Sequence, residues 1–116
     1  MIRRWLRSWH TRVAVVGDSM RPTLTAGDWL LVDPVAYAGA PPAVGDLVLV
    51  PDPRAPNRLL VKRVAEVYED GRELWLAGDA FDASTGSETF GSVATSTVQG
   101  RPWFRYWPPR RVGRVG

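Results

Sequence analysis

The sequence of 116 residues contains no cysteine and a single histidine, His10. The absence of cysteine excludes a disulfide, a thiolate nucleophile and a cysteine-ligated zinc site. The scarcity of histidine excludes a metal site built from several imidazoles, and His10 itself lies in an opening segment rich in arginine and tryptophan. We therefore expect no metal site, and the lack of cysteine is compatible with a reducing cytoplasm.

Long apolar runs are missing as well. No stretch approaches the roughly 18–20 residues that a membrane-spanning helix needs, and the first ten residues lack the apolar middle of a secretory signal. We expect a soluble, cytoplasmic chain, with peripheral contact at the inner face of a membrane as an alternative that the basic ends allow.

Acidic residues are absent from both ends of the chain. All twelve lie between Asp18 and Glu88, where six basic residues leave a net charge of 6 − 12 = −6, whereas 1–12 and 101–116 carry nine arginines. Basic ends of this kind can contact nucleic acid, anionic lipid or an acidic partner. Two solvated basic tails are the simpler interpretation, and we prefer it.

The hydrophobic pattern changes once, near the start. Residues 2–13 place apolar side chains at helical spacing, which predicts a short amphipathic helix. Short β-type runs separated by turn residues follow, with loops at 39–43 and 83–89. These runs are RVAVV, DWLLVD, DLVLVPD, RLLVKRVAEVYE, ELWLAGD and WFRYW.

We see neither an internal repeat nor a domain boundary and predict one mostly β domain. Its parts are a basic amphipathic segment at 1–12, the domain proper at 13–109 and a basic tail at 110–116.

Lysine is nearly as scarce as histidine: fourteen of the fifteen basic side chains are arginine, and Lys62 is the exception. An ammonium group can lose its proton when it is buried, whereas a guanidinium group effectively cannot. Lys62 lies on the same pleat face of a strand-like run as Leu60 and Val64. Burial there would lower its pKa and leave an amine able to accept a proton near neutral pH. An edge-strand lysine that points into water is the other interpretation.

Ser19 is the nucleophile that such a base would best serve. It follows an apolar run and precedes Pro22, which favours an extended Arg21 and places Ser19 on a turn. A turn can direct a hydroxyl and a backbone N–H into one cleft, and acyl transfer needs both as attacking group and oxyanion donor. Ser-Lys pairs are a known variant of the catalytic triad. A purely structural Gly-Asp-Ser turn remains the alternative.

Four segments resemble the type I signal peptidases, in the order in which that family has them. GDSMRPTL at 17–24 is similar to the Ser-Met-x-Pro-Thr nucleophile box, and LLVKRV at 59–64 is similar to the lysine box. Residues 78–93 align with the Gly-Asp-Asn…Ser…Gly-x-Val segment, and 100–113 with the Gly-Arg…Tyr-Trp-Pro close. The matches cover nearly the whole chain.

This resemblance implies that Ser19 is the nucleophile, that Lys62 is the general base and that Ser84 hydrogen-bonds to the lysine and orients it. The backbone N–H of Ser19 would be the oxyanion donor. The implied fold is a single domain of coiled antiparallel sheets, shared with the LexA-like self-cleaving repressors, and the reaction needs no cofactor. The remaining residues implied are Gly17, Asp18 and Met20 at the oxyanion site and substrate cleft, and Arg63, Gly78 and Asp79 in the structural boxes.

Several positions depart from the family pattern. Gly17 stands where many bacterial members have a serine hydroxyl as second oxyanion donor, and Ala80 stands where an asparagine follows Gly-Asp. Residues 86–88 are Gly-Ser-Glu in place of Asp-Ser-Arg, so the ion pair that braces this box is not expected in its usual form. Residues 1–18 also contain no apolar run like the membrane anchor that precedes the serine in signal peptidases, so we expect an anchorless member.

An anchorless, compact chain most resembles one subgroup, the nickel-type superoxide dismutase maturation proteases. We therefore predict a serine endopeptidase that removes an N-terminal leader from a precursor protein, with the nickel superoxide dismutase precursor as first candidate and no nucleic acid as partner.

Three alternatives stay open. The first is a signal peptidase held at a membrane surface by Trp5, Trp9 and the arginines. A LexA-like self-cleaving regulator fits less well, because no helix-turn-helix or internal cleavage segment is recognisable. The third, from a different class, is a non-catalytic module that binds nucleic acid or lipid through its Arg/Trp ends.

Overall fold

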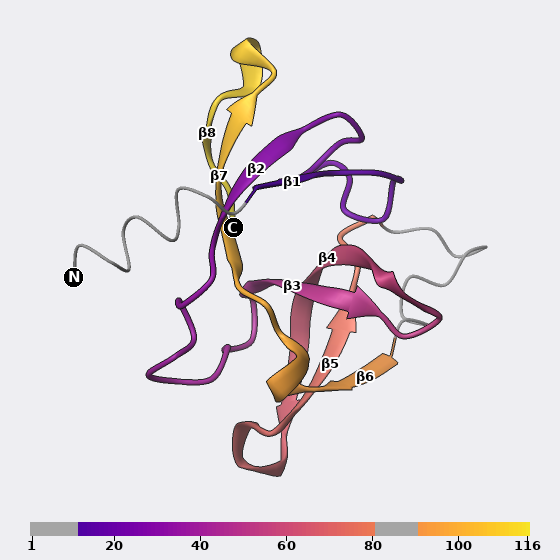
Figure 1. Cartoon of the computed structure of the whole chain (residues 1–116), viewed down its shortest axis with the longest axis vertical. Helices are drawn as coiled ribbons and strands as arrows, with labels where there is room; N and C mark the ends of the chain where they lie inside the picture. The colour runs from indigo at the N-terminus through magenta and orange to yellow at the C-terminus, as the bar shows by residue number, and fades with distance from the viewer. Residues whose placement is uncertain (1–11, 81–90) are drawn as a thin grey trace.

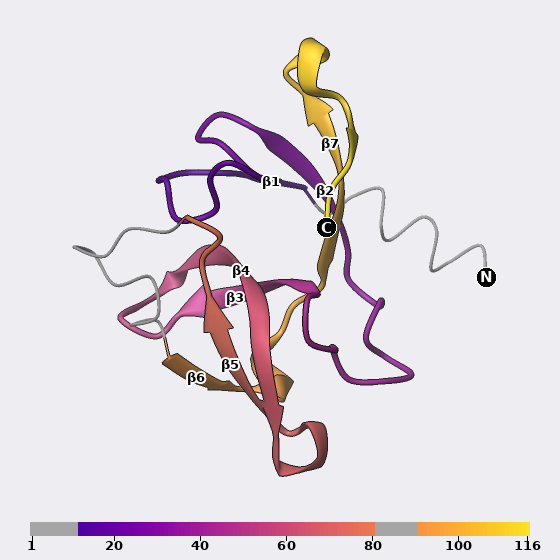
Figure 2. The same ribbon diagram turned by 180° about the vertical axis from the view of Figure 1, so that it is seen from behind.

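Two antiparallel sheets make up the fold in the computed structural model, which describes residues 12–80 and 91–116 (Figures 1 and 2). The first sheet has the order β1-β2-β7-β8 and the second the order β3-β4-β5-β6. The strands of the first sheet are β1 (Arg12–Ala14), β2 (Trp29–Asp33), β7 (Arg101–Trp107) and β8 (Gly113–Arg114). Those of the second are β3 (Leu47–Asp52), β4 (Ala55–Tyr68), β5 (Glu73–Ala77) and β6 (Gly91–Ala94). Single 3-10 turns are η1 (Glu69–Gly71), η3 (Thr95–Thr97) and η4 (Pro109–Arg111).

The strand β3 connects the two sheets. Its first four residues are all buried, which explains why the run is continuously apolar rather than alternating. Leu49 donates its N–H to the carbonyl of Gly100 at 3.0 Å and accepts from the N–H of Gln99 at 2.7 Å, just ahead of β7. On its other side β3 pairs with β4 from Leu47↔Arg63 to Asp52↔Ala55.

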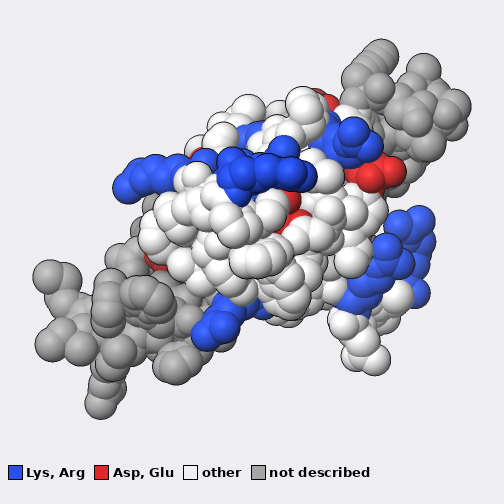
Figure 3. All heavy atoms as spheres, turned by 90° about the horizontal axis from the view of Figure 1, so that it is seen from above, with Lys and Arg blue, Asp and Glu red and all other residues white. Residues whose placement is uncertain are grey.

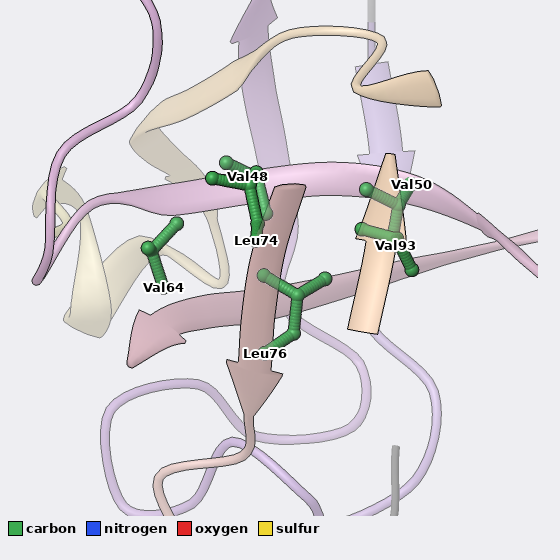
Figure 4. Close-up of a cluster of buried hydrophobic side chains, with 6 residues drawn as sticks. All are labelled: Val48, Val50, Val64, Leu74, Leu76 and Val93. Carbon is green, nitrogen blue, oxygen red and sulfur yellow. The ribbon is translucent and has the colours of Figure 1, made fainter. Parts of the chain in front are cut away.

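Two clusters of buried apolar side chains form the core. The first lies within the second sheet, where side chains of four adjacent strands meet (Figure 4). The second joins the chain after β1 to both sheets, so it fixes the segment that contains Ser19. The first cluster consists of Val48, Val50, Val64, Leu74, Leu76 and Val93, and the second of Val15, Met20, Leu24, Leu30 and Leu47.

The predicted fold class, a single mostly β domain of antiparallel sheets, is confirmed. All six β-type runs contain strands, and 39–43 is loop, whereas β6 and β8 were not expected. The predicted helix over 2–13 and the loop at 83–89 lie outside the described residues, except that Arg12 and Val13 belong to β1 rather than to a helix.

Some of the C-terminal arginines are paired, in contrast to the solvated basic tail predicted from the sequence. Arg105 and Arg111 donate to the carboxylate of Asp28, which is 2% exposed. The expectation of a solvated basic tail is therefore wrong for these two side chains. No helix within the described ranges is long and apolar enough to cross a membrane.

Candidate active site

Ser19 lies on a tight turn between β1 and β2. Gly17 opens this turn with a φ of +79°, in the left-handed region that favours glycine. The N–H of Arg21 donates to the carbonyl of Asp18 at 3.2 Å, so the chain reverses around the serine. The next side chain, Met20, is only 2% exposed and packs in the second core cluster. The half-buried serine is therefore held by an anchored neighbour.

The segment after β5 packs directly on this turn. The N–H of Ala80 donates to the carbonyl oxygen of Ser19 at 2.9 Å. A Cβ atom at position 78 would lie 2.3 Å from the same oxygen and 3.2 Å from the Cβ of Ser19. Only glycine permits so close an approach, and Gly78 thus brings the third motif of the sequence against the first.

Lys62 projects from β4 into the interior. Its residue is 7% exposed, and it pairs across the sheet with Val48, which is fully buried. Of the two interpretations that the sequence allowed, the edge-strand lysine in water is therefore wrong.

The surroundings of Lys62 disfavour its charged form. Burial lowers the pKa of the amine, and the nearby Arg54 guanidinium lowers it further, while the carboxylate of Asp52 opposes both. Arg54 itself is paired with Asp52 at 3.3 Å. The net result is an amine that is easier to deprotonate than an ordinary lysine.

A cleft runs between the nucleophile turn and β4. One wall consists of 13–17 with Ser19 and Met20, and the other includes Leu59–Val61. Lys62 is the next residue of β4, and both views show β1 and its turn above this strand (Figures 1 and 2). The serine therefore faces the strand that contains the buried amine.

Backbone groups of β4 point into this cleft. Leu49 lies opposite Val61, but its N–H and C=O bond to Gly100 and Gln99 rather than to β4. In an antiparallel ladder the backbone groups of such a pair point outward, and the direction repeats every second residue. The N–H and C=O groups of Val61 and Leu59 therefore point away from β3. On that side β5 pairs with β4 only from Arg63 onward. This part of β4 is thus an edge with polar groups available to a further strand.

The opposite wall has the same property. The N–H of Val15 donates to the carbonyl of Asp28 at 2.8 Å, so its backbone faces β2. By alternation Ala14 and Val16 direct their N–H and C=O groups toward the cleft. An extended peptide placed there can bond to both walls at once, as in strand addition at a sheet edge.

A charged cluster ties the turn to β4 beside the lysine. Arg63 binds the carboxylate of Asp79 in a bidentate pair, with Nε–Oδ1 at 3.0 Å and Nη2–Oδ2 at 2.6 Å. The hydroxyl of Thr23 donates to the same carboxylate at 2.6 Å. Burial alone would raise the pKa of Asp79, but the hydrogen bonds from Arg63 and Thr23 outweigh it and hold the pKa below its usual range. Asp79 therefore remains a carboxylate that links all three motifs.

The structure brings together most of the residues expected from sequence. Ser19, its turn, Gly78, Asp79 and Arg63 lie in one contiguous region, whereas Ser84 lies outside the described residues. Thr23 was not expected, although it ends the Ser-Met-x-Pro-Thr box. Within 12–80 and 91–116 no group of three or more His, Cys, Asp or Glu side chains is arranged to hold a metal ion.

The sequence of the chain is similar to those of known peptidases. Residues 5–68 match the family model described as "Signal peptidase, peptidase S26". The chain is 32% identical to the mitochondrial ATP-independent inner membrane protease subunit 1a of Arabidopsis thaliana, over 87% of this chain and 73% of the relative. It is 29% identical to the mitochondrial inner membrane protease subunit 1 of Xenopus tropicalis, over 84% and 69%. It is 26% identical to the probable signal peptidase I-1 of Synechocystis, over 88% and 74%.

These matches extend over most of the chain and run through both the serine turn and the lysine strand. They leave no support for a non-catalytic binding module. The chain belongs to the signal peptidase family, peptidase S26, and is a serine endopeptidase of the signal peptidase type.

Proposed function

We propose that Ser19 and Lys62 form a catalytic dyad that cleaves the leader from a precursor protein. The observation that carries this proposal is the burial of the sole lysine on the strand that faces Ser19 across the cleft. A neutral amine in that place is a general base, and a hydroxyl on a tight turn is the nucleophile it can activate.

The reaction follows the logic of acyl transfer. The neutral amine of Lys62 takes the proton of Ser19 as its Oγ attacks the scissile carbonyl carbon, and the backbone N–H of Ser19 donates to the oxyanion that forms. The C–N bond then breaks, and the lysine ammonium returns the proton to the leaving amine. Water releases the acyl group in a second round with Lys62 again as base. In this scheme Ser84 orients the amine, a role that rests on the family resemblance.

The substrate enters as an extended strand between the edges of β1 and β4. This mode requires main-chain hydrogen bonds to Ala14 and Val16 on one side and to Leu59 and Val61 on the other. It suits a leader junction without stable secondary structure. The apolar lining of the cleft favours small or apolar side chains near the cut.

For the substrate itself we propose the nickel-type superoxide dismutase precursor, on the strength of the sequence resemblance to that maturation subgroup. Two of the relatives are named as mitochondrial inner membrane protease subunits, which favours a substrate at a membrane instead. The cytoplasmic location remains a prediction that goes with the first substrate.

One feature of the surface favours the membrane alternative. A shallow hollow on the first sheet is lined by Arg12, Trp29, Tyr106 and Trp107. Trp29 and Trp107 are 41% and 52% exposed, and aromatic rings beside cations are typical of membrane–water interfaces. Trp5 and Trp9, on which the sequence-based alternative relied, lie outside the described residues.

The test is cleavage of two precursors side by side, with the new amino termini determined by mass spectrometry. One is a nickel superoxide dismutase precursor, and the other is an exported precursor with small residues before the cut. Ser19→Ala should abolish cleavage, and Lys62→Arg should lower kcat by about 10²–10⁴-fold, since it retains the charge but not the base. Full activity of Lys62→Arg would show that another group is the base, and cleavage of the exported precursor alone would reject the proposed substrate.

A further inference from the structure

A second charged cluster lies on the other side of the nucleophile turn. The Oδ2 atom of buried Asp28 accepts from Nη1 of Arg105 at 3.1 Å and from Nη2 of Arg111 at 3.4 Å. The backbone N–H of Thr25 donates to the same oxygen at 3.0 Å. One carboxylate thus joins β7 and η4 to the segment that follows the serine.

Arg105 also reaches the turn directly. Its Nη1 donates to the carbonyl of Thr23 at 3.0 Å, and its Nε donates to the carbonyl of Arg111 at 2.6 Å. The guanidinium fork is therefore fixed at several points. A lysine in its place would carry the charge but could not present donors in the same rigid plane.

Thr23 is consequently held from two sides. Its carbonyl is bound by Arg105 of the first sheet, and its hydroxyl is bound by Asp79, whose partner Arg63 belongs to the second sheet. Thr23 lies four residues after Ser19, and the N–H of Leu24 donates to the carbonyl of Met20 at 2.9 Å to close the turn between them. Thr23 is therefore part of the same backbone turn as the serine.

Stability alone is a weak reason for this arrangement. Burial of an ion cluster costs desolvation that the mutual attraction often fails to repay, and apolar residues of similar size often serve as well or better. The cluster does fix the conformation of the turn, because its hydrogen bonds can all form in only one arrangement.

We propose that Arg105 and Asp28 are positioning residues that act through Thr23 to hold Ser19 at a fixed distance from Lys62. This inference rests on the proposed dyad. The contacts form one chain across the molecule, from β7 through Thr23 and Asp79 to Arg63, the neighbour of the base. Ser19 and Lys62 come from different sheets, and Thr23 is where both sheets hold the serine turn.

The test compares Arg105→Lys with the control Arg110→Lys, an exposed arginine of η4. Leader-junction peptides of the two precursors named above are the substrates. Arg105→Lys should lower kcat about 10–100-fold with KM within about twofold, since a displacement of about 1 Å in a catalytic group has effects of this size. The midpoint of the pH profile of kcat/KM should be the same as in the parent protein, because the surroundings of Lys62 are unchanged. Arg110→Lys should behave as the parent protein.

Two further variants connect the effect to Thr23. Thr23→Val removes the hydroxyl at nearly constant shape and should lower kcat, whereas Thr23→Ser should restore most of it. If both contacts act on the same turn, the losses in kcat from Arg105→Lys and Thr23→Val should be non-additive in the double variant.

The outcomes separate the two proposals. Activity that survives Ser19→Ala or Lys62→Arg would reject the dyad and the positioning role with it. An inactive dyad variant together with an unchanged kcat in folded Arg105→Lys would reject the positioning role alone. If Arg105→Lys does not fold, Thr23→Val decides: unchanged kcat in that variant overturns the inference.

Discussion

The burial of Lys62 destabilises the charged form of its amine. A charged amine in an apolar setting is unfavourable, and the usual response is a lower pKa rather than a buried charge. Arg54 and Asp52, at the turn between β3 and β4, influence the amine in opposite directions. This side chain is therefore set for proton transfer at the expense of stability.

The pH dependence of cleavage follows from the direction of that shift. The active form is the neutral amine, so kcat/KM should rise as pH increases through the lowered pKa of Lys62 and reach a plateau above it. The measurement is initial cleavage rate of a leader-junction peptide from pH 5 to 9. A flat profile across this range would contradict amine catalysis.

Removal of the lysine should abolish activity but increase the stability of the folded protein. Lys62→Met should abolish cleavage and raise the free energy of unfolding at neutral pH, because the folded parent must leave its amine neutral or bury a charge. In the parent, stability rises with pH between the lowered pKa and the ordinary lysine value, since the unfolded chain binds more protons there. Urea unfolding at several pH values measures this effect. The difference in the free energy of unfolding between Lys62→Met and the parent should become smaller as pH rises. A variant less stable than the parent would contradict the claim that burial of the amine destabilises the fold.

The choice of Lys62 could be made from the sequence because fourteen arginines left one lysine to explain. Its burial could not, since it depends on how β3 and β4 pair and on what covers their faces. Thr23 and Arg105 escaped notice for a related reason: their roles arise from contacts between residues 56 and 82 positions apart.

At the scale of elements, the segment after β5 packs directly on the serine turn and leaves no room for a side chain at Gly78. Gly78→Ala would place a Cβ 2.3 Å from the carbonyl oxygen of Ser19, which forces the turn to move. We expect kcat/KM to fall about 100-fold. Gly39→Ala is the matched control, because a Cβ there meets nothing within 4 Å. Equal activity of the two alanine variants would mean that the position of the turn does not limit the reaction.

Most strands could be predicted from their apolar patterns, and β3 was recognisable even without alternation. The two that were missed are short: β6 has four residues and β8 has two, and neither offers a pattern long enough to indicate a strand. They form because a longer strand lies beside each of them: β6 pairs with β5, and β8 pairs with β7.

At the scale of the whole molecule, basic side chains gather at one end. Viewed from the end where η4 lies, blue basic side chains surround a largely white surface with few acidic atoms (Figure 3). Asp28, the carboxylate closest in sequence to Trp29, is buried and neutralised by two arginines. The hollow of Arg12, Trp29, Tyr106 and Trp107 thus combines the Arg12 guanidinium with two exposed tryptophan rings.

We expect this hollow to bind anionic vesicles if the enzyme works at a membrane surface. The double variant Trp29→Ala/Trp107→Ala should partition about tenfold less onto phosphatidylglycerol-containing vesicles, a loss that needs only about 1.4 kcal/mol. Tyr68→Ala is the control, since Tyr68 is 43% exposed but ends β4 in the other sheet. Co-sedimentation of the full chain measures the bound fraction, and undiminished binding of the double variant would place the membrane contact elsewhere.

The most direct measurement is the titration of Lys62 itself. Because the chain contains one lysine, isotopic labelling of lysine gives a single side-chain amine signal by NMR, free of overlap from other lysines. We predict a midpoint below the ordinary value of about 10.4, coincident with the midpoint of the kcat/KM profile. A midpoint at the ordinary value would contradict the central claim that Lys62 is the neutral base of the reaction.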